Sequence, residues 1–147
     1  MNKVKSLIFR CVFFITSVSA LASCEQKECC VLPPVGSELH GNWEFVRVNY
    51  GFSNTTQTAA EIGYTESLEI DMTNSRLRRL RDEVQVENTT FSLSDQGTSQ
   101  VITFEDEQTY SYYTVFEENG KTMLSLYERS PIGAILADGG VYYYEKK

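Results

Sequence analysis

Side chains that could support catalysis are few in this 147-residue chain and lie far apart in the sequence. His40 is the only histidine, and no elbow containing a serine or cysteine nucleophile lies near it. Glu105, Asp106 and Glu107 could act as acid and base, but adjacent acids between strands are more typical of a solvated turn. No glycine-rich phosphate loop is present. We therefore expect a protein that is not an enzyme.

All four cysteines, Cys11, Cys24, Cys29 and Cys30, lie near the N-terminus. The adjacent Cys29 and Cys30 cannot connect two distant parts of a core, although they could pair with each other, bridge to another molecule or be modified. A metal site would need more ligands at suitable spacing than these cysteines and His40 supply. The sequence therefore predicts no disulfide framework, no metal site and no cofactor.

A short arginine-rich segment stands out in a chain whose formal net charge is −7. It could hold an anionic head group or a carboxylated sugar by bidentate hydrogen bonds. The alternative, which we favour, is pairing across a hairpin with Glu69 and Asp71, at about 0–1 kcal/mol for each surface pair. Loss of one arginine would then barely change stability. The candidate anion patch consists of Arg76, Arg78, Arg79 and Arg81.

Asn119-Gly120 predicts a type I′ hairpin between strands Tyr110–Glu118 and Lys121–Glu128. Both faces of this hairpin are apolar, whereas a barrel wall needs only one apolar face. The second face could lie beneath a loop, line a cavity mouth or bind a partner protein. One face carries Val115, Leu124 and Leu126, and the candidate partner face carries Tyr112, Phe116, Met123 and Tyr127.

The acidic charge argues against nucleic acid as a partner, since like charges repel. The same repulsion makes purely electrostatic binding to anionic lipid head groups unfavourable. Attachment to a membrane would therefore need acyl chains.

The N-terminus has the pattern of a secretory signal peptide, with Lys3 and Lys5 before an apolar run at 7–20 and small residues before Cys24. The run is interrupted by Arg10 and is too short to favour a transmembrane helix. Leu21-Ala22-Ser23-Cys24 resembles the lipobox of bacterial lipoproteins; an ordinary secretory signal is the alternative.

The lipobox resemblance implies that residues 1–23 are removed and that the Cys24 thiol carries a diacylglycerol. Two or three acyl chains make anchoring stable. Residues 24–40 include Pro33 and Pro34 and are expected to form an extended tether. We expect the protein on the bacterial outer membrane, at the periplasmic leaflet or the cell surface.

Residues 41–147 are expected to form one all-β domain, since strand-like runs alternate with polar turn clusters about every ten residues. Short hairpins favour an up-and-down barrel of about eight strands, which hides both sheet edges; a sandwich is the second choice. We expect an Asn74-Ser75 turn, followed by a bulge at Arg79 that places Leu80 opposite Ile70. The predicted strands cover residues 43–50, 67–72, 76–81, 84–87, 89–93, 100–105, 110–118, 121–128 and 141–145.

Gly41-Asn42-Trp43 matches the Gly-x-Trp motif that opens the lipocalin barrel, and the tyrosine-rich segment Val141–Glu145 resembles the end of lipocalin-like domains in bacterial lipoproteins. Lipocalins also pack a late arginine against that tryptophan. The last strand here has no arginine, and Arg129 is the only late candidate. The resemblance implies a barrel whose mouth can hold a small apolar molecule.

Two functions are therefore expected for the domain. The first is a lipid-anchored binding protein that holds a small apolar or amphipathic ligand. The alternative is a protein-interaction or inhibitor lipoprotein of the envelope, with a filled barrel and the tyrosine-rich face as its contact surface. A packed core is the competing interpretation of the candidate ligand-lining residues Trp43, Phe45, Leu68, Ile70 and Met72.

Overall fold

The computed structural model describes residues 35–97, 99–134 and 139–147. The predicted signal peptide, Cys24, Cys29 and Cys30 lie outside the described residues. The chain separates into two compact units, of which Pro34–Lys147 holds all the described elements. This unit begins before the predicted boundary at Gly41, because Leu39 is buried as part of the core.

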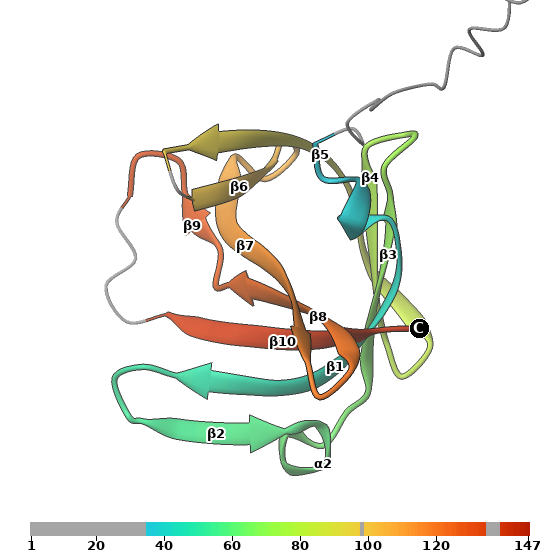
Figure 1. Ribbon diagram of the computed structural model, residues 1–147, viewed down its shortest axis with the longest axis vertical. Helices are drawn as coiled ribbons and strands as arrows, with labels where there is room; N and C mark the ends of the chain where they lie inside the picture. Colours follow the sequence, from blue (N-terminus) through green and yellow to red (C-terminus); the bar gives the residue numbers. More distant parts are fainter. Residues whose placement is uncertain (1–34, 98, 135–138) are drawn as a thin grey trace, which may run out of the picture. The chain divides into compact units, whose positions relative to one another are not determined.

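Eight antiparallel strands form a closed barrel, as predicted (Figure 1). Each strand pairs with the next one of the barrel along the chain, and the last pairs with the first, so the sheet has an up-and-down topology. Closure removes both sheet edges. The barrel strands are β1 (Gly41–Tyr50), β3 (Glu66–Asp71), β4 (Arg76–Arg81), β5 (Val84–Gln96), β6 (Ser99–Phe104), β7 (Thr109–Glu118), β8 (Lys121–Tyr127) and β10 (Gly140–Lys146).

Four short elements complete the domain. The 3₁₀ helix η1 (Ser37–Leu39) precedes β1, and β9 (Ser130–Pro131) pairs with β7. The strand β2 (Thr55–Thr58), which the sequence did not predict, pairs with the second half of β1. The helix α2 (Ala59–Ile62) follows β2 and supplies the short helical turn expected in this connection. Figure 1 shows β2 and α2 outside the barrel, beyond β1.

The turn between β3 and β4 is longer than predicted. Asp71 pairs with Arg76, so residues 72–75 form the turn, in place of Asn74-Ser75 alone. The Asp71 carboxylate accepts hydrogen bonds from the backbone N–H groups of residues 73 and 74 and from the Asn74 amide. This network gives the four-residue turn its own hydrogen bonds.

The predicted bulge at Arg79 is wrong for the pairing of β3 with β4. Ile70 lies opposite Leu77, and the ladder runs without a shift to the end of β4. The irregularity lies between Arg79 and Leu80 on the other side of β4, where it pairs with β5. Because side chains alternate along a strand, Arg79 and Arg81 share the inward face of the buried Leu77.

The strand β5 is longer than predicted. The sequence predicted two strands, 84–87 and 89–93, with a turn at Asn88, but the structure has one strand, Val84–Gln96. Asn88 pairs with Arg78 inside this strand. Turn-forming asparagine is tolerated here because its side chain points outward into solvent.

The Asn119-Gly120 hairpin is confirmed. Glu118 pairs with Lys121, and Asn119 and Gly120 have φ values of 53° and 74°, as a type I′ turn requires. Within the described residues, no helix is long and apolar enough to cross a membrane.

Replacing Gly120 with alanine is expected to lower the free energy of unfolding by about 1–2 kcal/mol, because a Cβ atom is unfavourable at positive φ. Gly51→Ala is the matched control, since Gly51 lacks a positive φ and a Cβ there would meet open space. Urea unfolding of both variants measures the difference. Equal midpoints for the two variants would contradict the assigned turn geometry.

Candidate functional site: the mouth of the barrel

One end of the barrel is closed by η1. The Trp43 indole N–H donates a hydrogen bond of 2.8 Å to the Leu39 carbonyl oxygen, which fixes η1 to β1. The Lys146 ammonium lies 5.2 Å from the centre of the Trp43 ring and donates to the Glu38 carbonyl oxygen at 2.9 Å. A cation from the last strand therefore packs on this tryptophan, as in lipocalins, but it is a lysine. Arg129, the late candidate, lies over Phe104 instead.

The candidate ligand-lining residues fill the barrel towards its closed end. Four of them are buried members of the core, and Met72 packs against it. None of the five lines the pocket at the opposite end. The four buried residues are Trp43, Phe45, Leu68 and Ile70.

The opposite end of the barrel holds a pocket of about 350 Å³. An apolar part of its wall comes from Phe104, Leu126 and Tyr142, and charged side chains line the rest. This volume is within the range of small-molecule sites. The complete lining is Arg79, Glu87, Phe104, Glu107, Ser111, Leu126, Tyr127, Glu128, Arg129, Tyr142 and Tyr144.

Glu87 connects two arginines inside this pocket. Its carboxylate oxygens lie 3.1 Å from Arg79 Nε and 2.5 Å from an Arg129 nitrogen. Arg129 also contacts Glu107 at 2.8 Å, and its guanidinium carbon lies 3.5 Å from the Phe104 ring centre. The arginine is thus held by two carboxylates and an aromatic face, which fixes its position at the mouth.

A second ionic group lies deeper, around Glu66, whose side chain is 3% exposed. Its carboxylate accepts hydrogen bonds of 2.7 Å from both Arg81 Nε and the Tyr144 hydroxyl. Burial, followed by the negative charge of Glu66, raises the pKa of Tyr144 well above its ordinary value. The phenol therefore stays protonated and remains a hydrogen-bond donor at neutral pH.

Arg79 lies between these two groups. Burial alone would lower its pKa, but attraction from Tyr144, Glu66 and Glu87 raises the pKa above the ordinary value. Its buried Nε has no hydrogen-bond partner among the described residues, because the nearby Glu87 oxygen lies off the N–H direction. Arg79 is therefore charged and incompletely paired beside the pocket.

The four candidate anion-binding arginines do not form one patch. Arg76 and Arg78 point outward from β4, where Arg78 contacts Glu69, while Arg79 and Arg81 face the interior. The predicted pairing of Glu69 with Arg81 is wrong; Arg81 lies opposite Glu66.

Arg79→Met is expected to lower the free energy of unfolding by about 1–3 kcal/mol, because Glu87 loses one of two buried cationic partners. Arg76→Met, on the solvent side of the same strand, is expected to change it by less than about 0.5 kcal/mol. Thermal or urea unfolding of the two variants tests the difference. Loss of one arginine is therefore expected to leave stability nearly unchanged only on the outside of the barrel. Equal effects of Arg79→Met and Arg76→Met would disprove the assignment of Arg79 to the inner face of β4 and of Arg76 to its outer face.

The candidate partner face divides into two groups. Tyr112 and Tyr127 are 36% and 47% exposed, and the Tyr112 ring makes edge-on contacts with Tyr110 at 5.6 Å and Tyr127 at 6.2 Å between centres. By contrast, Met123 is buried and Phe116 is half-buried.

Phe116 is covered by aromatic and charged neighbours on the outside of the barrel. Its ring packs edge-on against Tyr143 at 6.3 Å, and Arg47 lies 4.3 Å from the Tyr143 ring centre. Arg47 also makes two hydrogen bonds of 3.0 Å to Glu118. The aromatic cluster on the outside of the barrel is therefore the group Tyr110, Tyr112 and Tyr127, of which Tyr112 and Tyr127 are exposed and Tyr110 is half-buried.

The remaining sequence candidates lie at opposite ends of the barrel. His40 is at the closed end, where its Nδ1 accepts a hydrogen bond of 3.3 Å from the Met72 N–H. Residues 105–107 form an exposed turn at the mouth. Asp106 there accepts hydrogen bonds from the Thr89 hydroxyl and the Thr90 N–H. Within the described part of the chain, no cluster of side chains could hold a metal ion.

Sequence reasoning missed most of the mouth residues. Glu66, Leu68 and Ile70 are each two residues apart, so they lie on the same face of β3. The alternation of the strand could therefore have placed Glu66 inside the barrel. Glu87 and Arg129 are 42 residues apart in sequence and gave no such signal. Comparison of the chain with family models, curated proteins and solved structures finds no match.

Proposed function

We propose that this protein is a lipid-anchored binding protein of the bacterial cell envelope that holds a small amphipathic molecule in the mouth pocket. The observation that carries this proposal is the pocket of about 350 Å³ at the end of the barrel opposite η1. A closed far end and a core packed with Trp43 and its neighbours restrict a ligand to the mouth.

The lining indicates the chemistry of the ligand. Phe104, Leu126 and Tyr142 offer an apolar wall, while Arg129 and Glu128 offer charged groups beside it. Burial, then the neighbouring Tyr50 and Glu128, raises the pKa of Tyr142 to about 12, so its phenol is also a donor at neutral pH. A purely apolar molecule would remove water from these polar groups without replacing its hydrogen bonds, so an amphipathic one fits better.

The amphipathic sulfonate anilinonaphthalene sulfonate is a suitable probe of the pocket. The full chain in detergent is expected to bind it with a fluorescence increase, and Arg129→Met to weaken binding at least fivefold while unfolding stays cooperative. Arg76→Met, which removes a charge outside the mouth, is expected to bind as the parent does. Unchanged binding by Arg129→Met, or loss of binding in Tyr112→Ala, would contradict the mouth as the site.

Anchoring is tested separately at Cys24. Cys24→Ala expressed in a bacterium is expected to remain unprocessed by the lipoprotein peptidase and to carry no diacylglycerol, since the thiol is the acylated group. Mass spectrometry of the N-terminal peptide and membrane fractionation measure the two effects. A Cys24→Ala protein with the same processed mass and the same membrane fraction as the parent would disprove lipidation.

Protein recognition is the second candidate function. It is supported by the exposed group of Tyr110, Tyr112 and Tyr127, since aromatic side chains are enriched in protein interfaces. The probe experiment separates the two functions through Tyr112 and Arg129, because Arg129 lines the mouth pocket and Tyr112 does not, whereas Tyr127 lies at the rim and belongs to both surfaces.

A further inference from the structure

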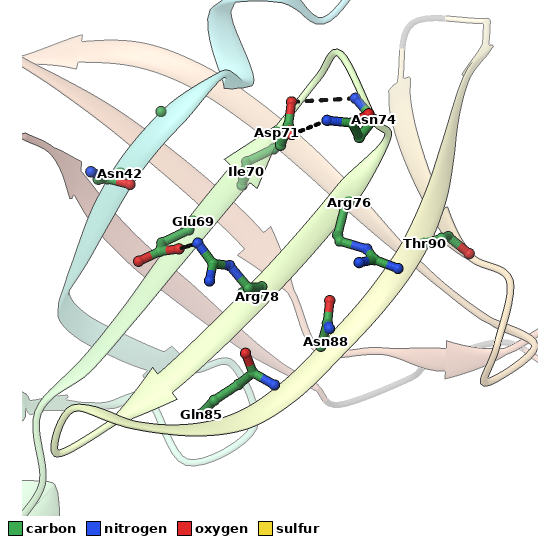
Figure 2. Close-up of a pocket in the computed structure, with 11 residues that line it drawn as sticks. Asn42, Glu69, Ile70, Asp71, Asn74, Arg76, Arg78, Gln85, Asn88 and Thr90 are labelled. Atoms are coloured by element: carbon green, nitrogen blue, oxygen red, sulfur yellow. Dashed lines mark hydrogen bonds and ion pairs between the residues drawn. The ribbon is translucent and has the colours of Figure 1, made fainter.

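A second hollow lies on the outside of the barrel and is separate from the mouth. Its volume is about 730 Å³, and it crosses β1, β3, β4 and β5 (Figure 2). It shares no lining residue with the mouth pocket. The lining residues are Gly41, Asn42, Glu69, Ile70, Asp71, Asn74, Arg76, Arg78, Gln85, Asn88 and Thr90.

Strand register explains why polar side chains gather there. Asn42 lies opposite Glu69, Glu69 opposite Arg78, and Arg78 opposite Asn88, which makes one row across four strands. A second row joins Arg76 with Thr90. These side chains all point outward, since the alternating residues on β3 and β4 face the core.

The two carboxylates that line the hollow already have hydrogen-bond or ion-pair partners. Glu69 contacts Arg78, and Asp71 accepts the hydrogen bonds of its own turn. The Asn74 side-chain hydrogen bond is the main cause that lowers the pKa of Asp71. Neither carboxylate is left to neutralise Arg76.

Arg76, by contrast, points across β4 towards β5, and Figure 2 shows its guanidinium directed towards Asn88 and Thr90. No ion pair to Arg76 is found among the described residues. Figure 2 marks no contact for Asn88 or Gln85 with the other residues drawn. The hollow therefore offers a guanidinium fork beside two side-chain amides, in a chain of net charge −7.

This combination fits one class of ligand. A guanidinium binds a carboxylate by two parallel hydrogen bonds, and amide side chains supply both donors and acceptors for hydroxyl groups. No aromatic side chain lines the hollow, which disfavours an apolar ligand. Its volume is also larger than one carboxylate needs and falls within the range of small-molecule sites.

We propose that the hollow across β1, β3, β4 and β5 binds an acidic saccharide, with a sugar carboxylate on Arg76 and sugar hydroxyls on Asn88 and Gln85. This site is independent of the mouth pocket and of the proposed amphipathic ligand. It gives the domain a surface that recognises uronic-acid-type sugars.

The test uses the full chain in detergent with trigalacturonate as the acidic probe and galactotriose as the neutral one. Calorimetric titration is expected to show binding of trigalacturonate at least tenfold tighter than that of galactotriose. Arg76→Met is expected to remove this preference, and Asn88→Ala to weaken both sugars. Lys121→Met, which neutralises an exposed cation elsewhere on the barrel, is the matched control and is expected to bind as the parent does.

Four outcomes would overturn the proposal. These are the absence of trigalacturonate binding, equal weakening by Lys121→Met and Arg76→Met, binding of citrate as tight as that of trigalacturonate, and loss of sugar binding in Arg129→Met. Equal weakening by Lys121→Met and Arg76→Met would indicate a general charge effect. Tight binding of citrate would indicate a simple anion site, and loss of sugar binding in Arg129→Met would indicate that the sugar binds in the mouth. The last outcome also separates failure of this proposal from failure of the mouth proposal.

Discussion

Replacing Trp43 with alanine is expected to lower the free energy of unfolding by about 3–5 kcal/mol, a large part of the 5–15 kcal/mol typical of a domain. The side chain is fully buried between β3 and β10, opposite Leu68 and Lys146. Its loss removes the packing at the closed end, the hydrogen bond to the Leu39 carbonyl and the contact with Lys146. Urea unfolding followed by far-UV circular dichroism measures the change, because Trp43 is the only tryptophan.

Two further variants separate the contributions at this site. Trp43→Phe keeps an aromatic ring for Lys146 but removes the indole N–H, so an intermediate loss is expected. Phe52→Ala is the matched aromatic control, since Phe52 is 85% exposed and should change stability by less than about 0.5 kcal/mol. A loss below about 1 kcal/mol for Trp43→Ala would show that η1 and Trp43 do not hold the end closed.

Local signals in the sequence were sufficient for the barrel. The Asn119-Gly120 pair is a turn with one strongly preferred geometry, so the register of β7 and β8 followed directly. Alternation of Leu68 and Ile70 with acidic residues fixed the inward face of β3. Closure was predictable because a meander of short hairpins otherwise leaves two exposed edges.

The failure at β4 has a specific physical cause. The predicted bulge at Arg79 rested on the rule that both Leu77 and Leu80 should face the core. The structure instead turns Arg79 and Arg81 to the inward face, Arg79 beside the mouth pocket and Arg81 partly exposed at its edge, because Glu87 and Glu66 on the two neighbouring strands compensate their charge. Such compensation across strands cannot be seen in one strand's own pattern.

The candidate site was only partly predictable for the same reason. The predicted lining residues Trp43, Phe45, Leu68 and Ile70 are in the core, but Tyr142 and Tyr144 of the last strand, which do line the mouth pocket, were not predicted to do so. The charged residues of the mouth come from four separate parts of the chain, and their proximity depends on closure. The interior of this barrel is therefore apolar towards η1 and ionic towards the mouth, a division that composition alone does not reveal.

The two ends also differ in their relation to the N-terminus. The described chain begins at Val35, beside η1 at the closed end. If Cys24 is lipidated as proposed, the tether joins the barrel at the end opposite the mouth pocket. The mouth pocket then lies away from the attachment point of the tether, whereas the hollow is lined by Gly41 and Asp71, close to the start of the described chain.

Stability is expected to fall steeply above pH 10, because two buried tyrosines must stay protonated in the folded state. Burial, then the charges of Glu38 and Asp95, raises the pKa of Tyr113 to about 12, and burial and Glu66 raise that of Tyr144 well above its ordinary value. In the unfolded chain both titrate near 10.

The direction of the effect follows from proton counting. Above pH 10 the folded state binds more protons than the unfolded state, so the stabilisation is complete below pH 10 and is lost as the pH rises. Tyr142 adds to this effect, since its pKa is also raised to about 12. Each of the three tyrosines contributes about 1.4 kcal/mol per pH unit, which amounts to roughly 8 kcal/mol by pH 12. Urea unfolding between pH 7 and pH 12, with phenolate absorbance as a second readout, measures this slope.

Tyr113→Phe is expected to reduce the slope by about a third while the absorbance at high pH loses one late-titrating phenol. Tyr127→Phe, at a tyrosine that is nearly half exposed on the outer face, is the matched control and should leave the slope unchanged. Stability that is flat up to pH 12, or equal slopes for the Tyr113→Phe variant and the parent, would contradict the burial of these phenols. Tyr144 is held by Glu66 beside the mouth, and Tyr113 lies towards the closed end. Comparison of Tyr144→Phe with Tyr113→Phe therefore reports whether the ionic and apolar halves of the barrel unfold as one unit.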